Sequence, residues 1–238
     1  MSLYRDEGVV LRTMRLGEAD RIVTLLTQGH GKVRAVVKGV RRTNSKFGGR
    51  LEPLNHLALL CWRGRELDIV NQAEVIDAFR TVREDLSRVT KAFTVLEVAD
   101  QLAQEGHGAP RLYDVVVGAL RSLEREDSPL LLAGFLLKAL ALEGSAPMVD
   151  DCASCGSAGP LVAFDLGQGG MLCDACRRGR PVSADALELV RRILGGGLSA
   201  ALAEPPSAAT SEVGELANEA MELHLDRRLR SLRASPAV

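Results

Sequence analysis

The feature that most constrains this chain is a set of four cysteines arranged as two Cys-x-x-Cys pairs. Cys152 and Cys155 form the first pair, Cys173 and Cys176 form the second, and 17 residues lie between the pairs. Four thiolates at this spacing can surround one ion tetrahedrally, as in structural zinc sites. We therefore predict one structural Zn²⁺ held by these cysteines in a zinc-ribbon-like module over residues 151–180. Because four thiolates leave no position for water, the ion is not expected to be catalytic.

Other interpretations of these cysteines fit the sequence less well. Two disulfides require an oxidising compartment, which nothing in the sequence indicates. A thioredoxin-like redox pair requires a βαβ setting, which the sequence around Cys152 does not predict. An iron–sulfur cluster also uses four cysteines, and a scaffold without metal is a further alternative. The fifth cysteine, Cys61, lies beside Trp62 in an apolar run and is expected to be a buried hydrophobic residue.

Residues 1–80 carry the pattern of an all-β domain. Short apolar runs follow one another at 7–14, 21–27, 32–40, 57–62 and 67–75, with glycines between them as turn signals. Five strands in about 75 residues suit a small closed barrel of the OB kind. The number of strands alone would suit an SH3-like barrel nearly as well.

After residue 80 apolar residues recur at helical spacing. We expect helices at 86–99, at 112–120 and at 130–142, the last one apolar nearly all round, as in the interior of a bundle. Beyond the cysteines we expect a helix capped by Ser183 and a final helix at 212–232. The predicted class is α+β, with a five-stranded OB-fold barrel at 1–80. A helical bundle domain at 81–150 and 181–238 is interrupted by the inserted four-cysteine module at 151–180.

Charge is divided unevenly along the chain, although the net charge is only −1. Residues 1–80 hold 14 Lys and Arg against 9 Asp and Glu, and no acid occurs between residues 32 and 50. The basic residues of that segment are Lys32, Arg34, Lys38, Arg41, Arg42, Lys46 and Arg50. Even spacing places the first three on one strand face, and a flexible loop is expected after them. We predict that these side chains, the basic segment, bind a phosphate backbone.

Two further groups of residues bear on this prediction. Tyr4, Phe47 and Trp62 are candidates for stacking on bases. Arg177, Arg178 and Arg180 form a second, weaker basic group beside the last cysteine. One alternative is that the basic segment is only a solvated charged surface. Another is a zinc-containing scaffold whose basic barrel binds another protein. A solvated surface normally mixes both signs of charge, however, and residues 32–50 do not.

Several runs of the sequence resemble the bacterial RecO family of recombinational DNA repair proteins. They include residues 8–11, the run LGEADRIVTLLT at 16–27, and the segment 41–54. The four cysteines after a helical stretch, and a last helix carrying His224 and residues 227–231, extend the resemblance over nearly the whole chain.

The resemblance implies an OB-fold, a helical domain and a zinc-binding module. It implies binding to single- and double-stranded DNA, annealing of complementary strands, and loading of the recombinase RecA onto strands coated by single-strand binding protein. RecR is the expected direct partner, and RecA an indirect one. DNA contact is carried over to Lys32, Lys38, Arg41 and Arg42. Some members of the family lack the cysteines, so zinc is not required for the activity itself.

No catalytic site is predicted, and the chain is not expected to be an enzyme. The four histidines are scattered, no P-loop occurs, and a closed four-cysteine site argues against a zinc-dependent nuclease. Annealing needs only charge screening and held strands. Without an apolar run of about 18 residues or an apolar signal core after Met1, we expect no membrane contact and a cytoplasmic, nucleoid-associated protein.

Overall fold

The computed structural model describes residues 2–233, which form two compact units. Unit 1 contains the chain up to Arg125 together with a short helix that begins at Arg230, and unit 2 contains Glu126–Leu229. The helices predicted at 81–150 are therefore shared between the units. Those before Arg125 belong to unit 1, and the apolar one after it belongs to unit 2.

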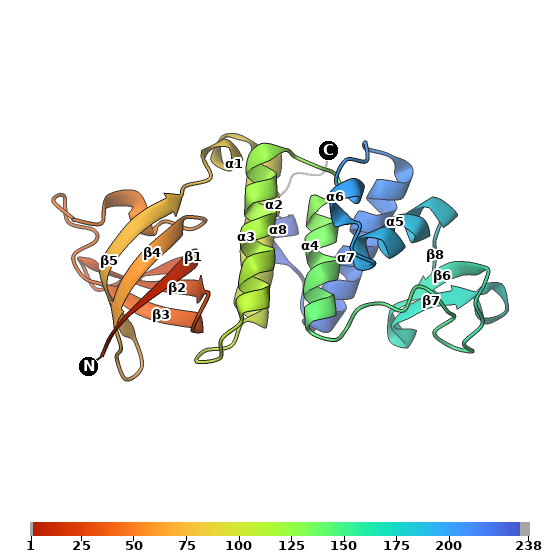
Figure 1. Ribbon diagram of the computed structural model, residues 1–238, viewed down its shortest axis with the longest axis horizontal. Coiled ribbons are helices and arrows are strands. Elements are labelled where there is room, and N and C mark those ends of the chain that lie inside the picture. Colours follow the sequence, from red (N-terminus) through yellow and green to blue (C-terminus); the bar gives the residue numbers. More distant parts are fainter. Residues whose placement is uncertain (1, 234–238) are drawn as a thin grey trace. The chain divides into compact units, whose positions relative to one another are not determined.

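Unit 1 is built around a closed barrel of five strands (Figure 1). They are β1 (Leu3–Leu16), β2 (Asp20–Thr27), β3 (Gly31–Val37), β4 (His56–Trp62) and β5 (Asp68–Asp77). Neighbours follow the order β1-β2-β3-β5-β4, and β1 closes the barrel by pairing with β4. All of these pairs are antiparallel except β3 with β5. The predicted OB-fold barrel is confirmed, and the SH3-like alternative is not what the chain forms.

Inward and outward side chains alternate along the strands, which separates the barrel core from the outer face. In β3, Val33, Ala35 and Val37 are buried, whereas Lys32 and Arg34 are half-buried on the outside. The inward residues of β3 meet those of the other strands, such as Val10, Leu25 and Leu57, in one apolar cluster. The same alternation that builds the core therefore places the basic side chains of β3 on the outer surface of the barrel.

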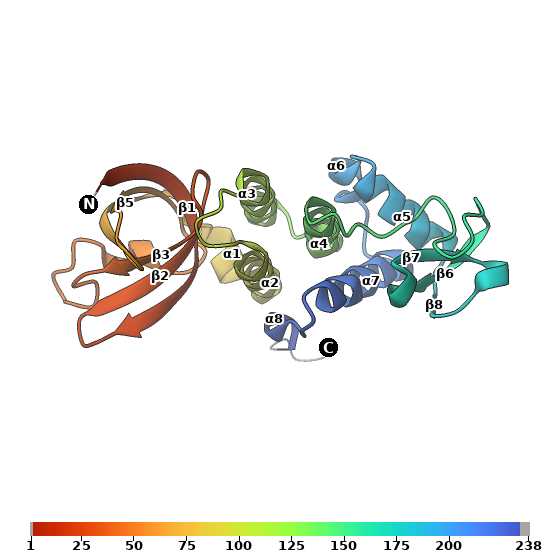
Figure 2. The same cartoon turned by 90° about the horizontal axis from the view of Figure 1, so that it is seen from below.

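Helices complete unit 1 beside the barrel. They are α1 (Arg80–Glu84), α2 (Leu86–Leu102), α3 (Pro110–Arg125) and α8 (Arg230–Arg233). Helix α2 packs against β1 and α3 against β2. Figure 2 shows α1, α2 and α3 beside the barrel. The carboxylate of Asp85 caps α2 by accepting the N–H of Arg88 at 2.9 Å. Glu97 of α2 accepts the N–H groups of Arg230 at 3.0 Å and Ser231 at 2.9 Å, which holds the start of α8.

The prediction of one final helix at 212–232 is wrong. Helix α7 (Ala208–His224) ends before Asp226, whose φ of +49° is incompatible with a continuing right-handed helix. The chain resumes helical structure only at α8. The apolar spacing conceals this break because Leu229, which lies between the helices, is buried like a core position of a continuous helix.

Unit 2 combines helices with a small sheet. Its helices are α4 (Leu131–Leu142), α5 (Ala184–Leu194), α6 (Leu198–Ala201) and α7. Helix α4 packs against α5 and α7 and is buried over most of its length, as its apolar sequence predicts. The predicted cap of α5 is confirmed, because the Ser183 hydroxyl accepts the N–H of Ala186 at 3.2 Å. Among residues 2–233, no helix combines the length and the apolar character needed to cross a membrane.

The sheet of unit 2 belongs to the cysteine module. Its elements are β6 (Leu161–Asp165), η2 (Leu166–Gln168), β7 (Gly170–Cys173), η3 (Asp174–Cys176) and β8 (Arg180–Pro181). Strands β6 and β7 form the antiparallel hairpin that the sequence predicts between the two cysteine pairs, and β8 pairs with the other edge of β6.

Candidate metal centre and nucleic-acid interface

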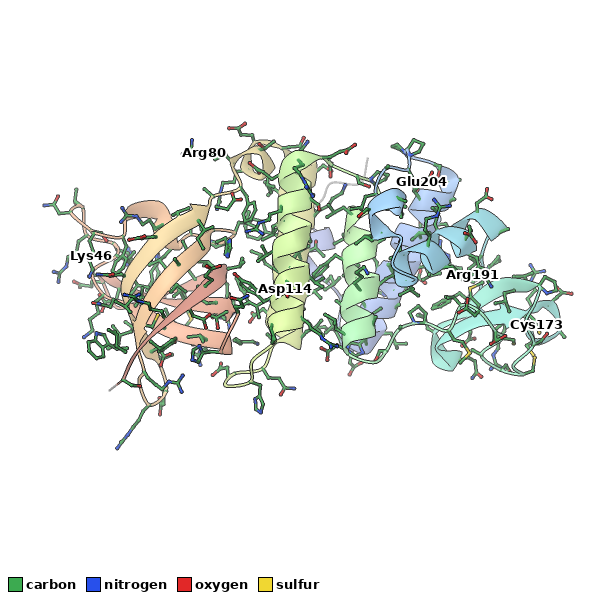
Figure 3. The ribbon with its side chains drawn as sticks, in the orientation of Figure 1. Lys46, Arg80, Asp114, Cys173, Arg191 and Glu204 are labelled. Atoms are coloured by element: carbon green, nitrogen blue, oxygen red, sulfur yellow. The ribbon has the colours of Figure 1, made fainter. Side chains whose placement is uncertain are left out.

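The four cysteines predicted as ligands come together at one end of the sheet of unit 2, around Cys173 (Figure 3). Their Sγ atoms all lie within 4.8 Å of one another, and those of Cys155 and Cys173 are 3.7 Å apart. A tetrahedral zinc ion with Zn–S bonds of about 2.3 Å requires S–S separations of about 3.8 Å. The arrangement of donors therefore fits the size and the charge of a four-coordinate zinc ion.

Two tight turns aim the sulfur atoms at this point. In the first turn Gly156, with φ of +74°, donates its N–H to the carbonyl oxygen of Cys152 at 2.8 Å. This turn is tied to the sheet because Ala153 donates to the carbonyl oxygen of Met171 at 2.8 Å. In the second, Cys173 ends β7 and Cys176 ends η3. Backbone hydrogen bonds of the first turn and the end of β7 thus bring the two cysteine pairs together.

The surroundings of the thiols favour uneven deprotonation. Backbone N–H groups, first that of Cys173 and then those of Cys155 and Ser154, lower the pKa of Cys152 to about 6. At Cys155 the N–H of Ser157 favours the thiolate, but hydrogen bonds with the other cysteine side chains outweigh it and raise the pKa to about 12. Without a cation, the four neighbouring thiols do not all lose their protons equally easily. A divalent cation among them would stabilise every thiolate.

The arginines beside the module are paired with acids of the same unit. Arg178 lies 3.4 Å from a carboxylate oxygen of Asp165, and Arg180 lies between Glu215 and Glu219. Arg177 lies 4.0 Å from Asp174. This weaker basic group is neutralised within unit 2, so it offers little attraction to a phosphate backbone.

The fold divides the basic segment into a strand part and a loop part. In the strand part, Lys32 Nζ lies 3.3 Å from a carboxylate oxygen of Asp100 in α2 and also donates to the Asp100 carbonyl. The Lys32 side chain is only 16% exposed. Arg34 is 35% exposed, and its Nε lies 3.9 Å from Glu105. Lys32 is therefore held against α2, and Arg34 is the more available cation of β3.

The loop part follows β3 and remains exposed. It carries Lys38, Arg41, Arg42, Lys46 and Arg50. Arg41 donates to the carbonyl oxygen of Glu18 at 2.9 Å, and Lys46, labelled in Figure 3, donates to that of Asn71 at 2.8 Å. These contacts position the side chains without neutralising them, because the acceptors are backbone carbonyls. Within residues 2–233, none of the five forms an ion pair with an acid.

The loop that the sequence predicts to be flexible is held to the barrel near its end. Phe47 is only 3% exposed and packs in the barrel core, together with Leu51 of η1 (Gly48–Leu51). The Asn55 amide also donates to the carbonyl oxygens of Gly49 at 3.1 Å and Arg50 at 2.8 Å. The suggestion that Phe47 stacks on bases is therefore wrong, because its ring anchors the loop instead.

Sequence reasoning missed other cations on the same unit. Arg63 and Arg65 lie in the turn between β4 and β5, and both are exposed. They line a groove together with Arg34 and Tyr4. The two arginines are inconspicuous in the sequence because Glu66 and Asp68 follow them closely. Only the pairing of β3 with β5 brings them near the strand part of the basic segment.

The fold and the site define a protein that joins an OB barrel to a helical part with a cluster of four cysteines that could hold a metal ion. The family model described as recombination protein O N terminal matches residues 1–79, and the one described as recombination protein O C terminal matches residues 83–233. The chain therefore belongs to the RecO family. Membership supports a role as a mediator in DNA repair and recombination.

Proposed function

We propose that this protein binds single- and double-stranded DNA through its basic segment and anneals complementary strands. We further propose that, with RecR, it helps to load RecA onto DNA coated by single-strand binding protein, at the nucleoid in the cytoplasm. Membership of the RecO family supports the recombination role. The observation that carries DNA contact is the anchored loop with five exposed cations, none of which pairs with an acid in the described part of the chain.

The physical basis is phosphate neutralisation. Two strands repel each other until counterions or a cationic surface screen their charge, and each Lys or Arg that contacts a phosphate releases bound counterions. An anchored loop holds its charges in place before DNA arrives, which reduces the entropy lost on binding. Annealing makes and breaks no covalent bond, so this proposal needs no catalytic residue.

Lys32 and Arg34, which the sequence predicts together as DNA contacts, have different roles in this proposal. Lys32 positions β3 through Asp100, so Arg34 and the loop carry the contacts to phosphate. The four-cysteine centre would hold Zn²⁺ in a structural role, because the ligand set closes the coordination sphere. The metal stabilises unit 2 and takes no step in annealing.

The test replaces two of these loop cations in the variant Lys38→Glu/Arg42→Glu. The matched control is Arg111→Glu/Arg125→Glu, which makes the same charge change on the exposed surface of α3. Binding is measured by fluorescence anisotropy at several salt concentrations, and annealing with and without single-strand binding protein. We expect the slope of log K against log salt to fall by about 0.7–0.9 for each phosphate that the variant no longer neutralises.

We also expect annealing by the loop variant to be lost, while the control anneals like the wild type. Circular dichroism confirms that both variants are folded. Equal DNA affinity of the loop variant and the wild type would contradict the proposal. That result would favour the alternative in which the basic barrel of a zinc-containing scaffold binds another protein.

A further inference from the structure

Two buried residues of unit 1 have a left-handed backbone conformation that L side chains rarely adopt. Leu54, two residues before β4, has φ of +78°, and Phe79, two residues after β5, has φ of +46°. Each of the two is only 1% exposed. Such conformations persist only where the surrounding structure holds them, and they cluster at functional sites. Contacts around the turns at 53–55 and 78–79 must therefore hold them in place.

One side chain, that of Arg83 in α1, joins these two turns. Its Nε donates to the carbonyl oxygen of Ala78 at 2.9 Å. Its Nη2 donates to the carbonyl oxygen of Pro53 at 2.7 Å and to Oδ1 of Asn55 at 2.8 Å. A guanidinium holds several acceptors at once because its N–H donors form a rigid planar fork, which a lysine ammonium cannot reproduce.

The contact with Arg83 fixes the orientation of the Asn55 amide. Asn55 is 6% exposed, and its amide nitrogen donates to the carbonyl oxygens of Gly49 at 3.1 Å and Arg50 at 2.8 Å. These carbonyls lie in η1, near the end of the loop between β3 and β4, the basic loop. Since arginine donates hydrogen bonds and accepts none, only the oxygen of the amide can face Arg83. The NH2 group must then face the two carbonyls of the basic loop.

The stretch of the basic loop that Asn55 contacts has few other supports. Phe47 and Leu51 are buried at its two ends. Gly48 and Gly49 between them have no side chains, and their Cβ positions would lie in open space. Glycine allows such a backbone many conformations. The two hydrogen bonds from Asn55 therefore select one of them.

Arg83 is held in turn by the helical part of unit 1. The carboxylate of Glu124 in α3 accepts the N–H groups of Thr81 at 3.1 Å and Val82 at 3.0 Å. It thereby fixes the first turn of α1, the helix that carries Arg83. A continuous series of contacts thus leads from α3 through α1 and Arg83 to Asn55, and from there to the basic loop.

We propose that Arg83 is a positioning residue for DNA binding, which acts through Asn55 to hold the basic loop in the conformation that meets DNA. The inference rests on the proposed DNA-binding function and adds to it a residue outside the basic segment. The Arg83 guanidinium already donates to three acceptors of the protein. Its part is to keep the loop cations in place, which reduces the ordering that binding would otherwise require.

The first experiment compares Arg83→Lys with the control Arg80→Lys, at an exposed residue of the same helix that is labelled in Figure 3. Both variants keep the positive charge, but Arg83→Lys loses the fork that joins the two turns. Measured by fluorescence anisotropy, DNA affinity of Arg83→Lys should be roughly 3- to 30-fold lower than that of the wild type. The control should bind like the wild type. If Arg83→Lys did so too, the proposal would be overturned.

The second experiment separates positioning from general stability. The amides of Arg50 and Glu52 donate to carbonyl oxygens of the preceding turn at 3.0 Å and 3.4 Å. Hydrogen–deuterium exchange of these amides should accelerate in Arg83→Lys, whereas exchange in β2 and β3 should stay as in the wild type. Acceleration throughout the barrel would show a merely structural role, and no acceleration at residues 50–52 would also contradict the assignment.

A double-mutant cycle tests whether Arg83 acts through Asn55. Asn55→Ser removes both the acceptor that faces Arg83 and the amide donors that face the basic loop. The variant Arg83→Lys/Asn55→Ser should therefore bind DNA no more weakly than Asn55→Ser alone. Losses that add would mean that Arg83 acts by another route, and the assignment would be wrong.

The two proposals fail in different ways. If the wild type binds no DNA, the proposed function is wrong, and the positioning role falls with it. If the wild type binds DNA and Lys38→Glu/Arg42→Glu weakens binding, but Arg83→Lys binds like Arg80→Lys, only the positioning role is wrong.

Discussion

At the scale of single residues, Gly31, the first residue of β3, combines a left-handed backbone with a very close steric constraint. Its φ is +66°, and a Cβ atom would lie 1.8 Å from the carbonyl oxygen of His107. We expect Gly31→Ala to lower the free energy of unfolding by about 2–5 kcal/mol, because left-handed strain and overpacking add. Urea unfolding followed by the fluorescence of Trp62 measures this loss.

Gly17→Ala is the matched control for that substitution. Gly17 has φ of +57°, but nothing lies within 4 Å of the position of its Cβ. It should lose only the strain energy, about 1–2 kcal/mol. Equal losses in the two variants would show that the turn at 103–109 yields easily to a side chain at Gly31.

Single residues also show where sequence reasoning succeeds and where it stops. The clustering of the four cysteines was predictable because each Cys-x-x-Cys pair is a local motif with its own turn. The engagement of Lys32 was not, because its partner Asp100 lies 68 positions later in the chain. Charge spacing predicts which strand face a lysine occupies, but not which helix will cover it.

At the scale of elements, the basic loop depends on Phe47. Truncation to Ala should cost about 3–5 kcal/mol of stability, as for other buried aromatic residues. It should also weaken DNA binding, although no charge is removed, because the loop loses its anchor. The control is Phe93→Ala in α2, where the ring is 41% exposed and both losses should be small. Thermal unfolding and anisotropy provide the two measurements, and unchanged DNA affinity of a folded Phe47→Ala protein would show that the anchor is dispensable.

Elements differ in how far the sequence determines them. The strands of the barrel were predictable because alternating burial leaves a period of two in the sequence, as in β3. The anchored loop was not, since Phe47 stands among polar and basic residues and only the closed barrel gives it an apolar site. The break after α7 was also hidden, because Leu229 continues the apolar spacing across Asp226.

At the scale of the whole molecule, the candidate metal site and the tryptophan lie in different units. Trp62, the single tryptophan, is in β4 of unit 1, whereas the four cysteines are in unit 2. Tryptophan fluorescence therefore reports the unfolding of unit 1, while far-ultraviolet circular dichroism also reports the helices of unit 2. The two signals can separate the stability of the units in the intact chain.

Removal of the metal should therefore lower the unfolding midpoint of only one of these two signals. Replacing Cys173 by Ser, or adding a chelator, is expected to lower the dichroism midpoint by at least about 10 °C, because metal binding contributes to the folding energy of its unit. The fluorescence midpoint should stay unchanged. Cys61→Ser, at a buried barrel position, should do the reverse: it keeps the metal content and lowers the fluorescence midpoint. If chelation lowered both midpoints together, the units would unfold as one, and the metal would support the DNA-binding barrel as well as its own module.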